Sequence, residues 1–97
     1  MIHYKGVQIS SRYDMVSEIG EMRRVIDAFT PMVLKRVQSI WCDSKAGAMY
    51  SVSILPGPWD ESIAAGIARA FRSGKGFNAI VLTCGKRQVF IDPSWQD

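Results

Sequence analysis

Few side chains of this sequence could serve as a nucleophile, a base or a metal ligand. There is one histidine, His3, and there are two cysteines, Cys42 and Cys84. Nucleophilic catalysis requires a nucleophile, a base and an orienting group within reach of one another. His3 could act with Cys42 or Cys84, but a lone histidine on an edge strand is far more often a solvated or hydrogen-bonded residue. The CxxC and HxxxH spacings of zinc sites are also missing. We therefore expect no catalytic site, no bound metal and no cofactor.

The two cysteines allow three interpretations. Both fall on predicted strands, where a buried thiol behaves as a small hydrophobic side chain. A reducing compartment favours free thiols over a disulfide between Cys42 and Cys84, and we expect free thiols. The remaining alternative is that one of them is a catalytic nucleophile, which predicts a thiol that reacts quickly.

Carboxylate pairs and a glycine-rich run suggest other chemistry, but their positions argue against it. Two carboxylates can act as acid and base in hydrolysis. However, Glu18 and Glu21 lie on the polar side of a predicted helix, and Asp60 and Glu61 suit the beginning of another. The run 73–76 (SGKG) has the composition of a phosphate-binding loop, yet that motif needs a strand before it and a helix after it. Here the order is reversed.

Basic side chains provide the strongest candidate for a functional surface. The sequence has 12 Lys and Arg against nine Asp and Glu, a net charge of +3, which permits a phosphate-bearing partner without requiring one. Cations are favoured at the C-terminal end of a helix, and three basic residues lie at the end of the helix predicted before Gly74. Two more lie at the turn of the hairpin predicted after it. We predict that five of these residues form one partner-binding surface: Arg69, Arg72, Lys75, Lys86 and Arg87.

The first half of the chain predicts a strand, a helix and a second strand. Residues 2–9 alternate apolar and polar side chains around a Lys-Gly pair, which predicts a strand or a very short hairpin. Apolar residues at spacings of three and four predict a helix over 14–29, in which Gly20 marks a close contact or a weak point. From Pro31 the pattern suits either a helix or a strand with Val37 and Trp41 on one face. We favour a strand over 35–42, followed by a turn at 43–47.

The second half predicts a strand, a helix and a hairpin. Over 49–55 apolar and serine side chains alternate, so one side is core and the other is solvent or a binding surface. Asp60 is the predicted N-cap of a helix that ends before Gly74. Two apolar runs separated by a turn at 84–86 then predict a hairpin, with Trp95 beyond it either folded back or exposed.

Together these elements predict an α+β fold with the order β-α-β-β-α-β-β. Adjacent strands separated by helices favour an antiparallel sheet with two helices packed on one face. The length of 97 residues and a composition that is 47% hydrophobic and 22% charged predict a single domain over 1–97. Apolar runs fall far short of the roughly 18 residues of a membrane span, and the N-terminus lacks a signal-peptide pattern. We therefore expect a cytoplasmic protein that does not bind membranes.

One segment resembles a known group of proteins. Over 63–93, an alanine-rich helix leads through Gly74 and Asn78 into the apolar run 79–82, a Gly-Lys turn and the ending VFIDP at 89–93. This third of the chain resembles the ending of some small phage-encoded inhibitors, including anti-CRISPR proteins. The resemblance implies a non-enzymatic protein that blocks a host complex by occupying its surface. It carries over no functional residue.

These observations lead to three hypotheses about function. The leading one is a small non-enzymatic binding protein, a phage-encoded inhibitor that occupies a protein or nucleoprotein complex through basic and aromatic side chains. The alternative is a small basic nucleic-acid-binding domain, with aromatic rings as stacking surfaces. The third is an enzyme that uses one of the cysteines. The sequence leaves the oligomeric state open, with a homodimer as one of the alternatives.

Overall fold

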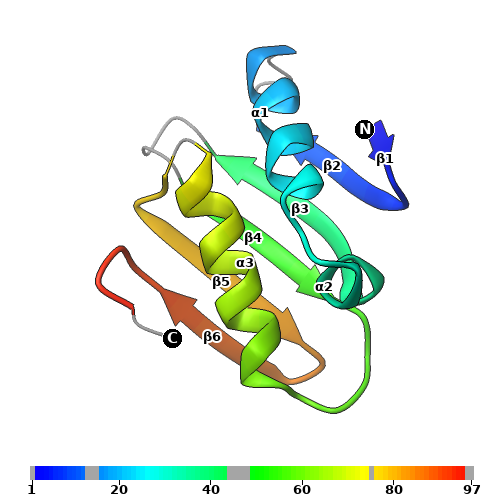
Figure 1. The fold of residues 1–97 in the computed structure, drawn as a ribbon, viewed down its shortest axis with the longest axis vertical. Helices are drawn as coiled ribbons and strands as arrows, with labels where there is room; N and C mark the ends of the chain where they lie inside the picture. Colours follow the sequence, from blue (N-terminus) through cyan, green and yellow to red (C-terminus); the bar gives the residue numbers. More distant parts are fainter. Residues whose placement is uncertain (1, 13–15, 44–48, 75, 96–97) are drawn as a thin grey trace.

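The backbone forms a six-stranded sheet with three helices over one of its faces (Figure 1). The computed structural model describes residues 2–12, 16–43, 49–74 and 76–95. The α+β class predicted from the sequence is confirmed. In chain order the elements are β1 (Ile2–Tyr4), β2 (Val7–Ser11), α1 (Val16–Asp27), α2 (Pro31–Arg36), β3 (Val37–Asp43), β4 (Met49–Ile54), α3 (Glu61–Ser73), β5 (Ala79–Cys84) and β6 (Arg87–Ile91).

The sheet is mixed rather than antiparallel. Its strands follow chain order from β1 to β6, and the pairs β1–β2, β3–β4 and β5–β6 are antiparallel. The pairs β2–β3 and β4–β5 are parallel, because a helix between neighbouring strands returns the chain to the edge where it started. The predicted antiparallel sheet is therefore wrong at these two pairs, and three helices rather than two cover one face.

The start of the chain is a hairpin, the second of the two alternatives that its pattern allowed. Lys5 and Gly6 join β1 to β2 with φ angles of 50° and 83°. Both angles are left-handed, as a two-residue type I′ turn requires. The Lys5 ammonium lies 2.7 Å from the Asp27 carboxylate of α1, so this turn also contacts the end of the helix. The pair is exposed, and we expect it to add little stability.

Both alternatives for the segment after Pro31 occur, one after the other. Thr30 caps α2, because Val33 donates its backbone N–H to the Thr30 hydroxyl at 3.3 Å, and Pro31 takes a first-turn position. The predicted strand over 35–42 is corrected: it begins at Val37 and ends at Asp43. Residues 44–47 of the predicted turn lie outside the described residues, as do residues 14 and 15 of the predicted first helix, which is observed from residue 16 to 27.

The last third of the chain matches its prediction. Asp60 caps α3, accepting the backbone N–H of Ser62 at 2.9 Å, and this bond lowers the pKa of the Asp60 carboxyl. The helix ends before Gly74, as predicted. A two-residue turn joins β5 to β6, and Trp95 folds back against the core.

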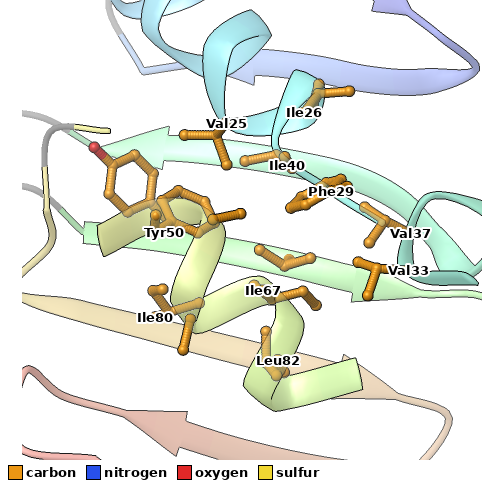
Figure 2. Packing of buried hydrophobic residues seen from close by; sticks show 14 of the residues in the cluster. Val25, Ile26, Phe29, Val33, Val37, Ile40, Tyr50, Ile67, Ile80 and Leu82 are labelled. Carbon is orange, nitrogen blue, oxygen red and sulfur yellow. The ribbon is translucent and has the colours of Figure 1, made fainter. Parts of the chain in front are cut away.

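The core lies between the helices and the sheet (Figure 2). Phe71 of α3 is fully buried, and its ring centroid lies 4.6 Å from that of Tyr50 on β4 and 6.3 Å from that of Phe77. Figure 2 shows side chains of α1, α2 and α3 meeting those of β3, β4 and β5. This packing accounts for the apolar stripes of α1 and α3.

Gly66 allows α2 to approach α3 closely. A Cβ atom at Gly66 would lie 2.6 Å from Val33 Cγ2, and a valine in a helix is stiff about χ1. We expect Gly66→Ala to lower the free energy of unfolding by about 1–2 kcal/mol, because overpacking outweighs the helix propensity that alanine adds. Urea unfolding measures the change.

Gly20 provides the matched control. A Cβ atom at Gly20 would meet nothing within 4 Å, so the predicted close contact is absent and this glycine is a weak point of α1. Gly20→Ala should raise the free energy of unfolding by about 0.5–1 kcal/mol. Equal changes of the same sign in both variants would contradict the account of Gly66.

Candidate protein-binding surface

Within the described residues, no helix covers the second face of the sheet (Figure 1). Side chains alternate between the two faces along each strand, and the strand registers align the outward-pointing ones in rows across the sheet. We call this surface the open face. Its polar row is His3, Gln8, Ser39, Ser53, Thr83 and Gln88, and its aromatic row is Ser10, Trp41, Ser51, Val81 and Phe90.

Large hydrophobic side chains stand exposed on the open face. Phe90 is 71% exposed, Trp41 40% and Met49 37%. Trp41 and Phe90 belong to the same row but lie three strand spacings apart, about 14 Å. Beside Trp41 and Met49 is a shallow hollow of about 120 Å³, bordered by small side chains of β4 and β5. Exposed hydrophobic side chains gathered on one surface mark an interaction site.

A β-bulge directs Trp41 outward. The β3–β4 register shifts between Val37 and Ser39, and an extra residue in one strand reverses which side chains face the core beyond it. Val37 is therefore buried while Trp41 is exposed. The strand pattern predicted that these two side chains share a face, and that prediction is wrong because alternation alone does not reveal a bulge.

The open face is almost uncharged. Among the described residues of its two rows only His3 is titratable, and the short row that holds Met49 and Ala79 adds Asp43. At one corner Arg12 Nη1 lies 3.2 Å from Asp43 Oδ2, so these charges offset each other.

Opposite charges stand at the two ends of β6, with Asp92 just past its last residue and Lys86 in the turn before its first. The side chain and backbone N–H of Ser94 donate to Asp92, and this lowers the pKa of the Asp92 carboxyl.

The structure does not bring the predicted basic residues together. Arg72, near the C-terminal end of α3, donates to the Trp95 carbonyl and lies over the Phe77 ring at 5.9 Å. Arg87 lies 5.4 Å from the centroid of the Trp59 ring, just before α3 begins. The two arginines therefore belong to opposite ends of a helix of 13 residues, about 20 Å long.

The other predicted basic residues follow the same division. Arg69 is exposed on the second half of α3, with Arg72, and Lys86 is exposed next to Arg87. Lys75 lies outside the described residues. The single surface predicted from these five residues is therefore corrected to two separate groups, because the β5–β6 turn meets the beginning of α3 rather than its end. Their role in binding a partner stays a prediction.

The candidate catalytic residues are also kept apart. His3 points to the open face, whereas Cys42 and Cys84 are buried on the core face, so the sheet separates the only imidazole from both thiols. The cysteines lie on β3 and β5, opposite Tyr50 and Ile54 of the strand between them. Their Cα atoms are about 16 Å apart by strand geometry, too far for a disulfide.

The two glutamates of α1 lie in the core or along a groove between helices. Buried Glu18 accepts a hydrogen bond from the Ser11 hydroxyl, while Glu21 borders a groove between α1 and α3 together with Arg24. Within the described residues, no three His, Cys, Asp or Glu side chains are placed to hold a metal ion. None of the described helices has the length and apolar character that a membrane crossing needs.

Tyr50 is the described residue with the largest resolved shift in pKa. Burial raises the pKa of its phenol to about 12, and the nearby Cys42, Glu21 and Glu18 add to the rise. Between pH 10 and 12 the unfolded chain therefore loses this proton while the folded protein keeps it, and the free energy of unfolding falls as pH rises. Below pH 10 both states hold the proton, so the group has no effect.

We expect Tyr50→Phe to remove this part of the alkaline loss of stability. The measurement is urea unfolding of both proteins at intervals from pH 9 to 12, where the difference between them should change with pH. Curves that stay parallel over this range would contradict the assignment. Tyr4, whose hydrogen bond to Asp27 at 2.9 Å also raises its pKa, is present in both proteins, so its contribution cancels in the difference.

Comparison with known proteins finds no match to a protein family, to a curated protein or to a solved structure. The resemblance to phage inhibitors therefore stays a prediction. Among the residues of the open face, sequence reasoning missed Phe90. The signal was present, since Val89, Phe90 and Ile91 are three successive apolar residues of one strand, and alternation forces the middle one outward when its neighbours face the core.

Proposed function

We propose that this chain is a small non-enzymatic binding protein that occupies the surface of a partner protein through its open face. One observation carries the proposal: a six-stranded sheet has an uncovered, nearly neutral face on which Trp41, Met49 and Phe90 are exposed. Exposed hydrophobic side chains that gather on one surface, rather than being scattered singly, are typical of interaction sites. Tryptophan is also among the residue types that contribute most to binding energy in interfaces.

The form of this function that we favour is inhibition by occlusion. A chain of this size, whose described residues do not assemble a catalytic group, can act by covering a surface that another molecule needs. Together with the resemblance of residues 63–93, this supports a phage-encoded inhibitor of a host nucleoprotein complex, acting in the cytoplasm. The open face would contact a protein component of that complex.

The distribution of charge favours a protein partner over a nucleic acid. Binding of nucleic acid relies on neutralising phosphates with clustered cations. The open face offers aromatic rings without such cations, and the described members of the predicted basic surface stand in two groups at opposite ends of α3. Aromatic stacking and phosphate contacts would therefore have to come from different surfaces.

Salt dependence tests the proposal. We expect the purified protein to recover a partner in stoichiometric amount from a lysate of the host cell, and the complex to persist as salt is raised from about 0.1 to 1 M, because the open face is nearly neutral. A nucleic acid held by several phosphate contacts would lose most of its affinity over this range. Release of the partner by salt or nuclease would contradict the proposal, as would failure to recover any stoichiometric partner.

A further inference from the structure

We propose that, in the isolated protein, the open face is covered by the open face of a second copy, forming a weak symmetric homodimer. This inference rests on the proposed function, because it uses the same surface and names its occupant. Three features of the open face support a copy of this chain as that occupant: its lack of net charge, the order of its two rows and the charges at the ends of β6.

The lack of charge makes self-association possible. A surface dominated by one sign of charge repels its own copy, and a charged partner would be selected by a complementary patch. The two rows of the open face hold serine, threonine, glutamine and hydrophobic side chains, with His3 at the edge strand as their only titratable group among the described residues. The Asp43 carboxylate, in the row of Met49, forms an ion pair with Arg12. Two such faces can meet without burying unpaired charge.

The two rows are complementary to each other in size. Consider a two-fold axis that lies in the plane between two facing sheets, perpendicular to the strands and midway between the rows. Rotation about it places the aromatic row of each copy on the polar row of the other. Each strand then lies over the same strand of the second copy, so Trp41 meets Ser39 with the small Ser53 beside it, and Phe90 meets Gln88 with the small Thr83 beside it. Each aromatic ring thus has a small side chain beside its site on the second copy, which lets the side chains of the two faces interdigitate as in sheet-on-sheet packing.

The same axis pairs opposite charges. It runs across β6 at Val89, midway between Lys86 and Asp92, so Lys86 of each copy lies near Asp92 of the other. Both residues are exposed, and two symmetric Lys–Asp pairs would form at the rim of the interface. Rim pairs of this kind contribute mainly to the orientation of the partners. The size match and the charge match therefore select the same arrangement.

The area of the face predicts that the dimer is weak. Six strands about 4.8 Å apart, each presenting about five residues of 3.3 Å, cover roughly 500 Å² per copy. Two copies would bury about 1,000 Å², at the lower limit for a specific interface and below the standard size of about 1,600 Å². A dimer of this size can dissociate readily, so a partner that binds the open face more tightly would replace the second copy.

Charge reversal tests the arrangement. We expect sedimentation velocity of the wild-type protein to detect a monomer–dimer equilibrium between about 1 µM and 1 mM. Lys86→Glu alone and Asp92→Lys alone should each weaken the dimer about ten-fold, because each creates two like-charged pairs. An equimolar mixture of the two variants should restore the wild-type affinity, since in the mixed dimer both pairs again have opposite signs.

Controls separate loss of the fold from loss of the interface. Asp92 accepts hydrogen bonds from Ser94, so Asp92→Asn, which keeps an acceptor, should weaken the dimer less than Asp92→Lys. Thermal unfolding checks that each variant is folded. A wild-type protein that stays monomeric at 1 mM would overturn the homodimer, as would a dimer that neither variant weakens or that mixing does not restore.

The two proposals fail in different ways. A protein that is monomeric at 1 mM but loses its lysate partner when Trp41 and Phe90 are replaced would overturn the homodimer and leave the proposed function standing. A protein that dimerises as described but recovers no partner under any condition would support the homodimer and contradict the inhibitor. Each result therefore bears on one proposal separately from the other.

Discussion

The double substitution Trp41→Ser and Phe90→Ser is expected to abolish binding of the partner protein while leaving the fold intact. These aromatic side chains supply much of the exposed hydrophobic area of the open face. Truncating an interface hot spot costs about 2 kcal/mol or more, so the two together should weaken binding at least a hundred-fold. Quantitative capture of the partner from lysate by wild-type and variant protein measures the loss.

The fold should survive this change because neither side chain packs in the core. Trp41 is 40% exposed and Phe90 71% exposed, and serine at an exposed strand position costs about 1 kcal/mol or less. Met32→Ser is the matched control, because Met32 is a hydrophobic residue of α2 that is 48% exposed. Equal losses of binding in the double variant and in Met32→Ser would show that general hydrophobicity, rather than the open face, holds the partner.

Replacement of Phe71 by alanine is expected to have the largest effect on stability. Phe71 is fully buried, and its ring packs against those of Tyr50 and Phe77. Removing it leaves a cavity between α3 and the sheet, and Phe→Ala substitutions at such sites cost about 3–5 kcal/mol. Small domains have total stabilities of about 5–15 kcal/mol, so the variant should be partly or wholly unfolded at 37 °C. Thermal and urea unfolding measure the loss.

A second substitution keeps this prediction interpretable when the variant does not fold. Phe71→Leu retains most of the apolar volume and should cost about 1–1.5 kcal/mol, so it should fold with a lower melting temperature. If Phe71→Ala proved as stable as the wild type, the core described between α3 and β4 would be wrong.

Patterns that depend on short stretches of chain were read correctly from the sequence. The α3 helix and the β5–β6 hairpin have their own start and stop signals, with Asp60 capping one end and Gly74 following the other. The same kind of signal at Pro31 was ambiguous, because a short helix and a strand follow each other without a break between Arg36 and Val37. Local preference identified both elements but could not place their boundary.

Properties that depend on how the elements pack could not be obtained in this way. The direction of β2 relative to β3 depends on the path of α1 and α2 over the sheet. The outward position of Trp41 depends on a bulge that follows from pairing with β4. The separation of Arg72 from Arg87 depends on which end of α3 meets the hairpin turn. Helix stripes and strand alternation describe one element at a time and contain no information about these relations.

The candidate site shows the same division. Alternation over 49–55 predicted a core side and a second side that is solvent or a binding surface, and the structure places Ser51 and Ser53 on that second side. The neighbouring rows became visible only once all six strands were in register. A surface made from six strands has no single motif, which is why sequence reasoning turned instead to the basic residues.

The indole signals of the three tryptophans, recorded by nuclear magnetic resonance in the complex with the partner protein, test the central claim most directly. Trp41 lies on the open face, while Trp59 donates its indole N–H to Glu61 at 2.8 Å on the helix side and Trp95 packs against the core. We predict that the Trp41 signal shifts or broadens when the partner binds and that those of Trp59 and Trp95 keep their positions. A Trp41 signal that stays in place while that of Trp59 or Trp95 moves would contradict the open face as the binding surface.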